Sequence, residues 1–320
     1  MICLIVNSLI SGVDSASVSI GIGQSIGLGK FMQFFMRQMI ELENQMTCME
    51  RVQEYIDIKP ESNTGEKPEK WPTMGNINYR DVKLRYPKTN QLTLKGVSFD
   101  VEGKQKIGII GRTGAGKTSI ISALFRLYEV EDGDIEIDNK KIRTIELKTL
   151  RSNMSIIPQS PVLFSNTIRA NLDPKMEYSD SDLWRALEEV GLKDMIANTD
   201  GQLDSKVQEG RLNFSAGQKQ LMCLARAIIK KNKIIILDEA TANIDPHTDV
   251  LLQETISRVF KDCTILTIAH TLKSVLNSDK VMVVSGGEII EFDAPETLLK
   301  DTNSNFYYLV TQSGLRNKDV

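Results

Sequence analysis

Residues 111–118 read GRTGAGKT and match the phosphate-binding pattern GxxxxGK[ST] at every fixed position. Glycine lets the backbone turn with its N–H groups pointing inward, so a polyphosphate can be cradled at the N-terminus of the following helix. Lys117 would reach the β- and γ-phosphates as a point charge, and the hydroxyl of Thr118 would bind Mg²⁺. The residues expected to contact nucleotide here are Gly111, Arg112, Thr113, Gly114, Ala115, Gly116, Lys117, Thr118 and Ser119. The alternative is a chance glycine-rich turn, but the apolar run before the loop and the amphipathic segment after it favour a phosphate site.

A second group of polar residues follows apolar runs that are typical of buried strands. Asp238 and Glu239 end the run IIILDE, which places both carboxylates at the carboxyl edge of a parallel sheet, where α/β proteins bind ligands. We expect Asp238 to complete the Mg²⁺ shell and Glu239 to polarise the attacking water as general base. Gln159 follows another short apolar run and could join the Mg²⁺ or water shell. His270 ends a further strand and could hydrogen-bond the γ-phosphate, although a lone histidine is more often structural.

The segment FSAGQ, residues 214–218, predicts a second phosphate-binding surface. It opens a helix with Ser215 near the N-cap, and exposed N–H groups at a helix N-terminus attract anions. One chain cannot easily fold this surface onto its own phosphate loop, so we expect it to serve a nucleotide held by another domain. The residues expected there are Ser215, Ala216, Gly217 and Gln218. Separately, the face of Tyr86 could stack on an adenine ring, although a tyrosine near a turn more often packs against protein.

Alternating and apolar runs predict the elements that position these groups. Strands are expected at 77–84, 92–101 and 106–110, before the phosphate loop, and a strand pair within 133–142. Residues 165–205 have a helical pattern and are predicted to be a helical insert. Its apolar positions include Leu183, Ala186, Leu187 and Val190. The sequence therefore predicts an α/β fold with an added group of helices.

Composition limits the classes of partner. The chain has 320 residues, 41% of them hydrophobic and 25% charged, which suffices for one large or two medium globular domains. A net charge of −3 and an isoelectric point near 5.7 provide no basic surface for nucleic acid, so no nucleic-acid partner is expected. The four cysteines lack a metal-ligand spacing and are expected to be reduced thiols.

The first 56 residues differ from the rest in composition. A charge-free stretch rich in Gly, Ser and Ile leads into a run with apolar residues every three or four positions, which predicts one long amphipathic helix. A signal peptide is disfavoured because no positive charge precedes the first apolar run. An ordinary surface helix is the alternative to a membrane helix that extends into the cytosol, and we prefer the membrane helix because it explains the apolar start. In that case the chain is a fragment of a larger membrane protein.

Taken in order and spacing, these residues resemble the nucleotide-binding domain of ATP-binding cassette (ABC) transporters. The resemblance rests on Tyr86, GRTGAGKT, Gln159, FSAGQ, IIILDE, the loop 242–245 and His270. It implies ATP and Mg²⁺ as cofactors, and nucleotide contact by Asp245 at the end of that loop. It also implies an α/β fold: a P-loop NTPase core of ABC type with an antiparallel β subdomain and an α-helical subdomain, preceded by the end of an α-helical transmembrane domain.

Longer phrases, such as KIGIIGRTGAGKTSIISALFRL and MSIIPQSPVLF, are similar to the second half of a C-subfamily exporter of the multidrug-resistance-associated type. That similarity implies an ATPase that drives export of organic anions, conjugates or drugs. The implied partners are the first nucleotide-binding domain of the same parent chain, paired head to tail, the transmembrane domains, the lipid membrane and a small-molecule substrate. It implies a multi-pass membrane protein with this domain in the cytosol, at the plasma membrane rather than an internal one.

Two alternatives to a pump stay open. Other members of the family are a regulatory receptor for a potassium channel and an ATP-gated chloride channel. A soluble cassette ATPase that acts on ribosomes or DNA is a more distant alternative, which the apolar start and the lack of a basic patch disfavour.

The expected division of the chain is a membrane-domain end with its helical extension at 1–56, a linker at 57–72, the nucleotide-binding domain at 73–313 and a tail at 314–320. The linker is proposed because residues 57–72 are polar and contain three prolines. The resemblance identifies FSAGQ as the signature motif of the family, and it implies that this motif faces a first-domain site that hydrolyses ATP poorly. Ala216 and Phe214 replace the usual glycine and leucine of that motif, which fits the weaker of two unequal sites. Thr271 stands where an arginine is common, and Thr118 replaces a serine conservatively.

Overall fold

The structure is a computed structural model that describes residue 6 and residues 15–87, 89–207, 214–238, 244–269 and 272–312. The chain forms two compact units, Met1–Ser62 and Asn63–Val320. The second unit begins inside the segment 57–72 that the sequence assigns to a linker. Several hydrogen bonds attach this segment; for example, Glu66 N–H donates to Thr144 O at 2.8 Å, and Trp71 Nε1 donates to Ile137 O at 3.1 Å. Residues 63–72 therefore belong to the folded unit.

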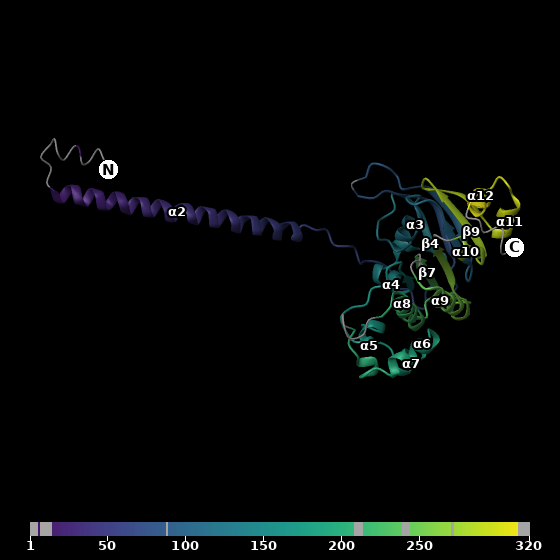
Figure 1. The fold of residues 1–320 in the computed structure, drawn as a ribbon. Helices are drawn as coiled ribbons and strands as arrows, with labels where there is room; N and C mark the ends of the chain where they lie inside the picture. The colour runs from purple at the N-terminus through teal and green to yellow at the C-terminus, as the bar shows by residue number, and fades with distance from the viewer. Residues whose placement is uncertain are drawn as a thin grey trace. The chain divides into compact units, whose positions relative to one another are not determined.

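The first unit is dominated by the single helix α2, Ser15–Ile56 (Figure 1). The predicted amphipathic helix and the charge-free stretch before it form one continuous element of 42 residues. Its large apolar side chains, among them Phe31, Phe34 and Met39, are exposed. Within the described ranges, none of the helices is both long enough and apolar enough to cross a bilayer.

The second unit contains an antiparallel sheet in the order β2-β1-β4-β5. Its strands are β1 Ile77–Leu84, β2 Leu94–Val101, β4 Asp132–Ile137 and β5 Lys140–Lys141. Alternation along β1 buries Ile77 and Tyr79 on one face, as expected for a sheet that covers a core. The Tyr79 hydroxyl donates to Ile120 O at 2.9 Å, which joins this sheet to the helix that follows the phosphate loop. The antiparallel β part expected from the resemblance is thus confirmed.

The second sheet has six strands in the order β10-β9-β3-β8-β7-β6. They are β3 Lys106–Ile110, β6 Met154–Ile157, β7 Ile234–Asp238, β8 Thr264–Ile268, β9 Lys280–Ser285 and β10 Glu288–Asp293. All neighbours pair in parallel except β9 and β10, which are antiparallel. The carboxyl ends of β6, β7, β8 and β3 therefore meet at one edge of the sheet, where the predicted site residues follow.

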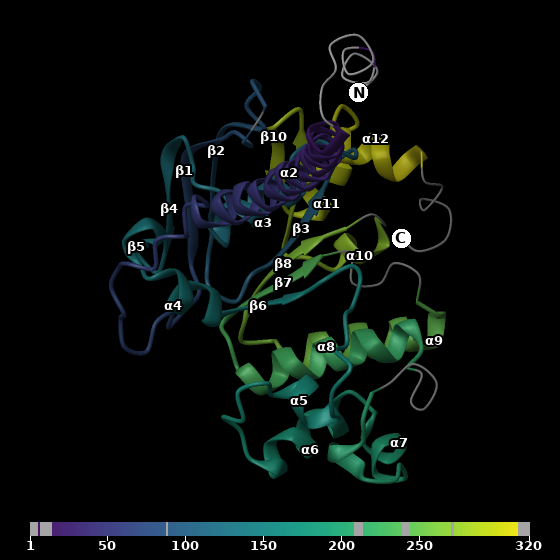
Figure 2. The ribbon, with the colours of Figure 1, turned by 90° about the vertical axis from the view of Figure 1, so that its left-hand side faces the viewer.

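Helices cover both faces of this sheet. Among the described residues, the helices of the second unit are α3 Lys117–Leu124, α4 Leu147–Ser152, α5 Ile168–Leu172, α6 Asp180–Glu189, α7 Lys193–Ala197, α8 Ala216–Lys230, α9 Pro246–Val259, α10 Lys273–Leu276, α11 Pro295–Lys300 and α12 Asn305–Gln312, with short 3₁₀ turns η1 Ile142–Thr144 and η2 Gln202–Asp204. Of these, α3 and α8 pack on the sheet in two separate buried cores. Figure 2 shows α8 between the strands β6–β8 and the helices α5 and α6. The predicted helical insert is confirmed, and its apolar positions Leu183, Ala186, Leu187 and Val190 are buried.

Candidate functional site

The phosphate loop connects β3 to α3 at the carboxyl edge of the sheet. Gly111 has a φ of 155°, and a Cβ there would lie 2.2 Å from Val284 O, so only glycine fits. Gly116 is the N-cap of α3 in a left-handed conformation, with a φ of 110°. Ala115 N–H donates to Arg112 O at 3.0 Å, which closes the turn between them. The glycines predicted for this loop therefore serve both its tight turn and its close approach to β9.

Lys117 lies across this loop. Its side chain is buried, and Nζ donates to Gly111 O at 2.7 Å and to Arg112 O at 3.3 Å. The ammonium is thus held beside the loop that would enclose a phosphate, which is the position that a phosphate-binding lysine requires. Its neighbour Thr118 is exposed.

Within the described residues, the N-terminus of α3 has no side-chain cap. In the same part of the chain its N-cap, Gly116, provides no side-chain hydrogen bond, as is also the case at the starts of α4, α7, α10 and α11, whereas Thr167, Ser179 and Ser215 cap α5, α6 and α8 with their hydroxyls. First-turn N–H groups without a side-chain acceptor suit an external anion, and the helix dipole favours negative charge there. A Cβ on Gly114 would meet no atom within 4 Å, so the loop is open on that side. These features fit a bound polyphosphate.

The parallel register aligns the remaining strand ends. Asp238, the last residue of β7, is the register partner of Ile268 in β8, and Ile268 is the partner of Ile109 in β3. Neighbouring strands lie about 5 Å apart, so Asp238 is about 10 Å across the sheet from the strand that enters the phosphate loop. On the other side, Ile157 of β6 pairs with Leu237, and Gln159 follows as an exposed residue. Carboxylate, amide and hydroxyl oxygens from Asp238, Gln159 and Thr118 are donors that suit Mg²⁺.

Glu239 and His270 lie outside the described residues, as do residues 242 and 243 of the loop that ends at Asp245, and Thr271. Their predicted roles stay predictions. Glu239 and His270 each follow directly after a described residue at this edge of the sheet. Glu239 follows residue 238, which ends β7, and His270 follows Ala269, whose N–H donates to Ile109 O at 3.1 Å.

Tyr86 is half-buried beside α3. Its hydroxyl lies 2.8 Å from Ser119 Oγ, within hydrogen-bonding distance, and its ring contacts Tyr128 edge to face with centroids 4.6 Å apart. The structure therefore brings Tyr86 next to the first turn of the helix that follows the phosphate loop. Tyr128 is a contact that sequence reasoning missed, because nothing in its neighbourhood distinguishes it from other aromatic residues.

The residues predicted for a second phosphate-binding surface lie at the start of α8. Ser215 Oγ accepts from Gln218 N–H at 3.1 Å, and Gln218 Oε1 accepts from Ser215 N–H at 2.9 Å, a complete capping box. The N-cap prediction for Ser215 is confirmed. Ser215 and Ala216 are exposed, whereas Gln218 is partly buried and its Nε2 contacts Met195 Sδ at 3.4 Å. Ser215 and Ala216 are therefore the accessible residues of this surface.

Gly217 connects this surface to the next helix. A Cβ on Gly217 would lie 2.8 Å from Thr248 Cγ2, so the first turns of α8 and α9 are in close contact. Asp245 caps α9 by accepting from Thr248 N–H at 2.9 Å, and this backbone hydrogen bond is the main cause that lowers the pKa of Asp245. The exposed residues Ser215, Ala216 and Asp245 thus belong to neighbouring helix starts. Thr248 was missed because its approach to Gly217 joins residues far apart in the chain.

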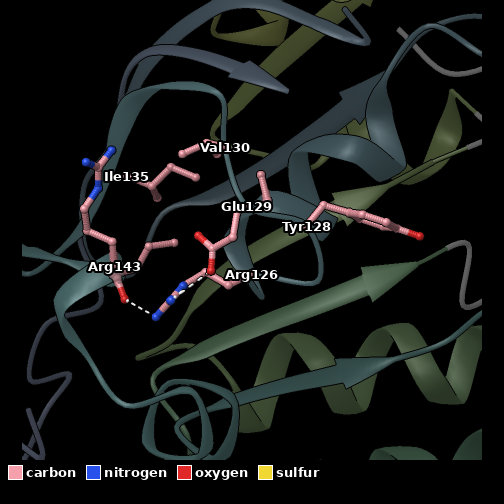
Figure 3. Close-up of a pocket in the computed structure, with 8 residues that line it drawn as sticks. Arg126, Tyr128, Glu129, Val130, Ile135 and Arg143 are labelled. Carbon is pink, nitrogen blue, oxygen red and sulfur yellow. Dashed lines mark hydrogen bonds and ion pairs between the residues drawn. The ribbon is translucent and has the colours of Figure 1, made fainter. Parts of the chain in front are cut away.

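A small hollow lies elsewhere, among Ala123, Arg126, Tyr128, Glu129, Val130, Ile135, Ile142 and Arg143 (Figure 3). Arg126 donates to Glu129 Oε1 at 3.0 Å and to Ile142 O at 3.1 Å across it. Its volume is about 10 Å³, roughly what one water molecule needs. The hollow contains none of the predicted site residues and is too small for a nucleotide.

Comparison with known proteins agrees with this geometry. The family model described as "ABC transporter" matches residues 94–242. The chain is 48% identical over 309 residues to "Probable multidrug resistance-associated protein lethal(2)03659" of Drosophila melanogaster, a match that covers 94% of this chain and 22% of the relative. It is 46% identical to "ATP-binding cassette sub-family C member 4" of Homo sapiens, with 94% and 23% covered. "Metal resistance protein YCF1" of Saccharomyces cerevisiae is 42% identical, with 96% and 21% covered.

The chain spans less than a quarter of the length of these relatives, and the matched part includes the phosphate loop, the start of α8 and the strand end at Asp238. The motifs lie at one edge of the sheet, and the relatives are named as C-subfamily and multidrug-resistance-associated proteins. This chain therefore belongs to the ABC transporter family, in its C subfamily.

Proposed function

We propose that this chain binds and hydrolyses ATP as the second nucleotide-binding domain of an exporter of organic anions, conjugates or drugs. Domains of the ABC transporter family bind ATP and hydrolyse it, so membership of the family supports both activities for this chain. The observation that carries the proposal is the alignment of the phosphate loop, Asp238 and Gln159 along one edge of the parallel sheet. The names of the relatives support a transport role, and the transported substrate class belongs to the proposal.

In this proposal the residues of the chain divide the work of nucleotide binding. The N–H groups at the start of α3 and the Lys117 ammonium hold the phosphates, and the ring of Tyr86 contacts the adenine. Thr118, Asp238 and Gln159 would hold Mg²⁺, which when bound neutralises charge on the phosphates. Glu239 takes a proton from the attacking water, and His270 holds that water in line.

The surface at Ser215, Ala216 and Asp245 faces a nucleotide bound to another domain, the first nucleotide-binding domain of the parent. Two observations support this: these residues are exposed, and they lie at the starts of α8 and α9, whose first turns are in close contact. The membrane placement of residues 1–56, the cytosolic position of the domain and the plasma membrane as its location are parts of the same proposal.

The test is ATP-dependent uptake of a fluorescent organic anion into inside-out vesicles that carry the full-length parent. Uptake that requires ATP is expected, and Glu239→Gln should abolish it while ATP binding persists. Lys117→Ala should instead weaken ATP binding by at least tenfold, because a charge-assisted contact to phosphate is lost. ATPase activity unchanged by Glu239→Gln would contradict the catalytic assignment. Absent uptake with intact ATP binding would favour a channel or a channel regulator.

A further inference from the structure

We propose that Gln220 is a positioning residue that holds the loop of Gln159 against α8. Gln220 lies in the second turn of α8 and is 1% exposed. Its Nε2 donates to Pro158 O at 2.9 Å, and Pro158 directly precedes Gln159. The amide of Gln220 thus fixes the backbone next to the residue that would bind Mg²⁺ or the attacking water. This inference rests on the proposed function.

Stability alone does not explain a glutamine at this position. Within the described part of the chain, Gln220 Oε1 is buried and has no hydrogen-bond partner. A buried acceptor without a partner destabilises the fold, whereas an apolar side chain of the same shape would fill this space without that loss. The donated hydrogen bond to Pro158 O is the feature that a glutamine provides here and a leucine does not.

The loop of Gln159 follows β6, and α8 also holds its other end, near residues 162–164. Arg226 of α8 donates from Nη1 to Val162 O at 3.0 Å and from Nε to Asn171 O at 2.6 Å. Asn171 is buried. Its Oδ1 accepts from Phe164 N–H, and its Nδ2 donates to Phe164 O. The loop backbone is therefore attached to α8 near both ends, while the Gln159 side chain stays exposed.

This attachment connects two parts of the proposed mechanism. The first turn of α8 carries Ser215 and Ala216, the surface proposed to face the nucleotide of the partner domain, and the second turn carries Gln220. A helix moves as a rigid element, so a shift of its first turn also shifts Pro158 and with it Gln159. Gln220 is thereby placed between the surface for one nucleotide and the loop of Gln159, which would contact the Mg²⁺ or the attacking water of the other.

The test measures ATP affinity of the 320-residue chain by calorimetry, once with Mg²⁺ and once with EDTA. For the wild type we expect Mg²⁺ to raise the affinity, and for Gln159→Ala we expect that gain to shrink. Gln220→Leu should reduce the gain by about three- to tenfold, the factor that one buried hydrogen bond supplies, with affinity in EDTA unchanged. Gln220→Met, which also lacks the donor, repeats the test if the leucine variant does not fold.

Asn232→Ala is the matched control. Asn232 is also a buried amide that donates to a backbone oxygen, Ser152 O at 3.0 Å, but at the opposite end of β6. It should leave the Mg²⁺ gain unchanged. The double variant Gln159→Ala/Gln220→Leu should lose no more than Gln159→Ala alone, because Gln220 acts through Gln159.

The experiment distinguishes a failure of the proposed function from a failure of the inference about Gln220. A wild-type chain that does not bind ATP would overturn the proposed function, and an unchanged Mg²⁺ gain in Gln159→Ala would remove the role of Gln159 and this inference with it. If Gln159→Ala shows its effect while the Gln220 variants keep the full gain, the inference alone is overturned. An equal loss in Asn232→Ala, or additive losses in the double variant, would also overturn it.

Discussion

Tyr86 is fixed at two points, by Ser119 Oγ at its hydroxyl and by an edge-to-face contact with Tyr128 at its ring. A ring held in this way loses little conformational freedom when a base stacks on it. We therefore expect Tyr86→Ala to weaken ATP binding by about tenfold or more, since stacking on an aromatic ring contributes roughly 1–3 kcal/mol per base. Tyr86→Phe should keep most of the affinity, because the ring remains. Titration with a fluorescent ATP analogue would measure both.

Inorganic triphosphate provides the control for this prediction. It has no base, so its affinity should be the same for the wild type and for Tyr86→Ala. Ser119→Ala removes the other half of the hydrogen bond and should resemble Tyr86→Phe. Equal losses for ATP and triphosphate in Tyr86→Ala would mean that the tyrosine supports the phosphate loop rather than the base.

At the scale of elements, the contact between α8 and α9 depends on Gly217. Alanine is favoured over glycine in a helix by about 1 kcal/mol, but a Cβ here would lie 2.8 Å from Thr248 Cγ2. Overpacking of this kind costs about 1–3 kcal/mol. Thr248 cannot easily turn away because its backbone and side chain both bond Asp245. We expect Gly217→Ala to lower the free energy of unfolding by about 1 kcal/mol in urea denaturation.

Thr248→Ser tests the cause, because it deletes Cγ2 and keeps the hydroxyl. In that background Gly217→Ala should cost less, since the methyl group at 2.8 Å is gone and only Cβ and Oγ at 3.2 Å remain to be met. The same cost in both backgrounds would show that the clash with Thr248 is not what requires glycine.

The elements that could be predicted are those whose signal is local in sequence. The phosphate loop, the strand that ends at Asp238 and the N-cap Ser215 each follow from a few consecutive residues. The contacts between Gln220 and Pro158, and between Gly217 and Thr248, join residues far apart in the chain, so no local pattern announces them. The roles of Glu239 and His270 rest on sequence alone.

The attachment of residues 63–72 to the folded unit also could not be predicted from local sequence. Residues 63–72 are polar and proline-rich, like a free linker, and composition alone cannot reveal the partners to which they attach. Trp71 is buried and bonds Ile137 O, and Asn63 Nδ2 donates to Glu146 Oε1 at 3.2 Å. The start of the folded unit at Asn63 therefore became visible only with the fold.

At the scale of the whole domain, Asp138 fastens residues 73–76, which follow this segment, to the antiparallel sheet. Its carboxylate accepts hydrogen bonds from the N–H groups of Thr73, Met74, Gly75 and Asn76 at 2.7–3.2 Å. Burial by itself would raise the pKa of Asp138, but these four donors outweigh it and hold the pKa below the ordinary value of 3.8. The charged form is therefore favoured by folding.

Asp138→Asn should lower the free energy of unfolding by about 2 kcal/mol at neutral pH, because hydrogen bonds to a charged acceptor are lost. A folded-state pKa below the unfolded value means that the stabilisation is fully present above about pH 5 and is lost as the carboxylate becomes protonated at lower pH. The difference between wild type and Asp138→Asn should therefore shrink as the pH falls through and below 3.8. Urea denaturation across this pH range measures it.

Asp262→Asn is the matched control, since Asp262 forms an exposed ion pair with Lys104 at 2.9 Å. Exposed ion pairs contribute little to stability and are screened by salt, so this variant should stay close to the wild type at every pH. An Asp138→Asn loss that does not change with pH would mean that the shape of the side chain, and not its charge, attaches the segment. A loss that disappears in high salt would contradict the local hydrogen-bonded arrangement, because charge-assisted hydrogen bonds at short range are screened far less than exposed pairs.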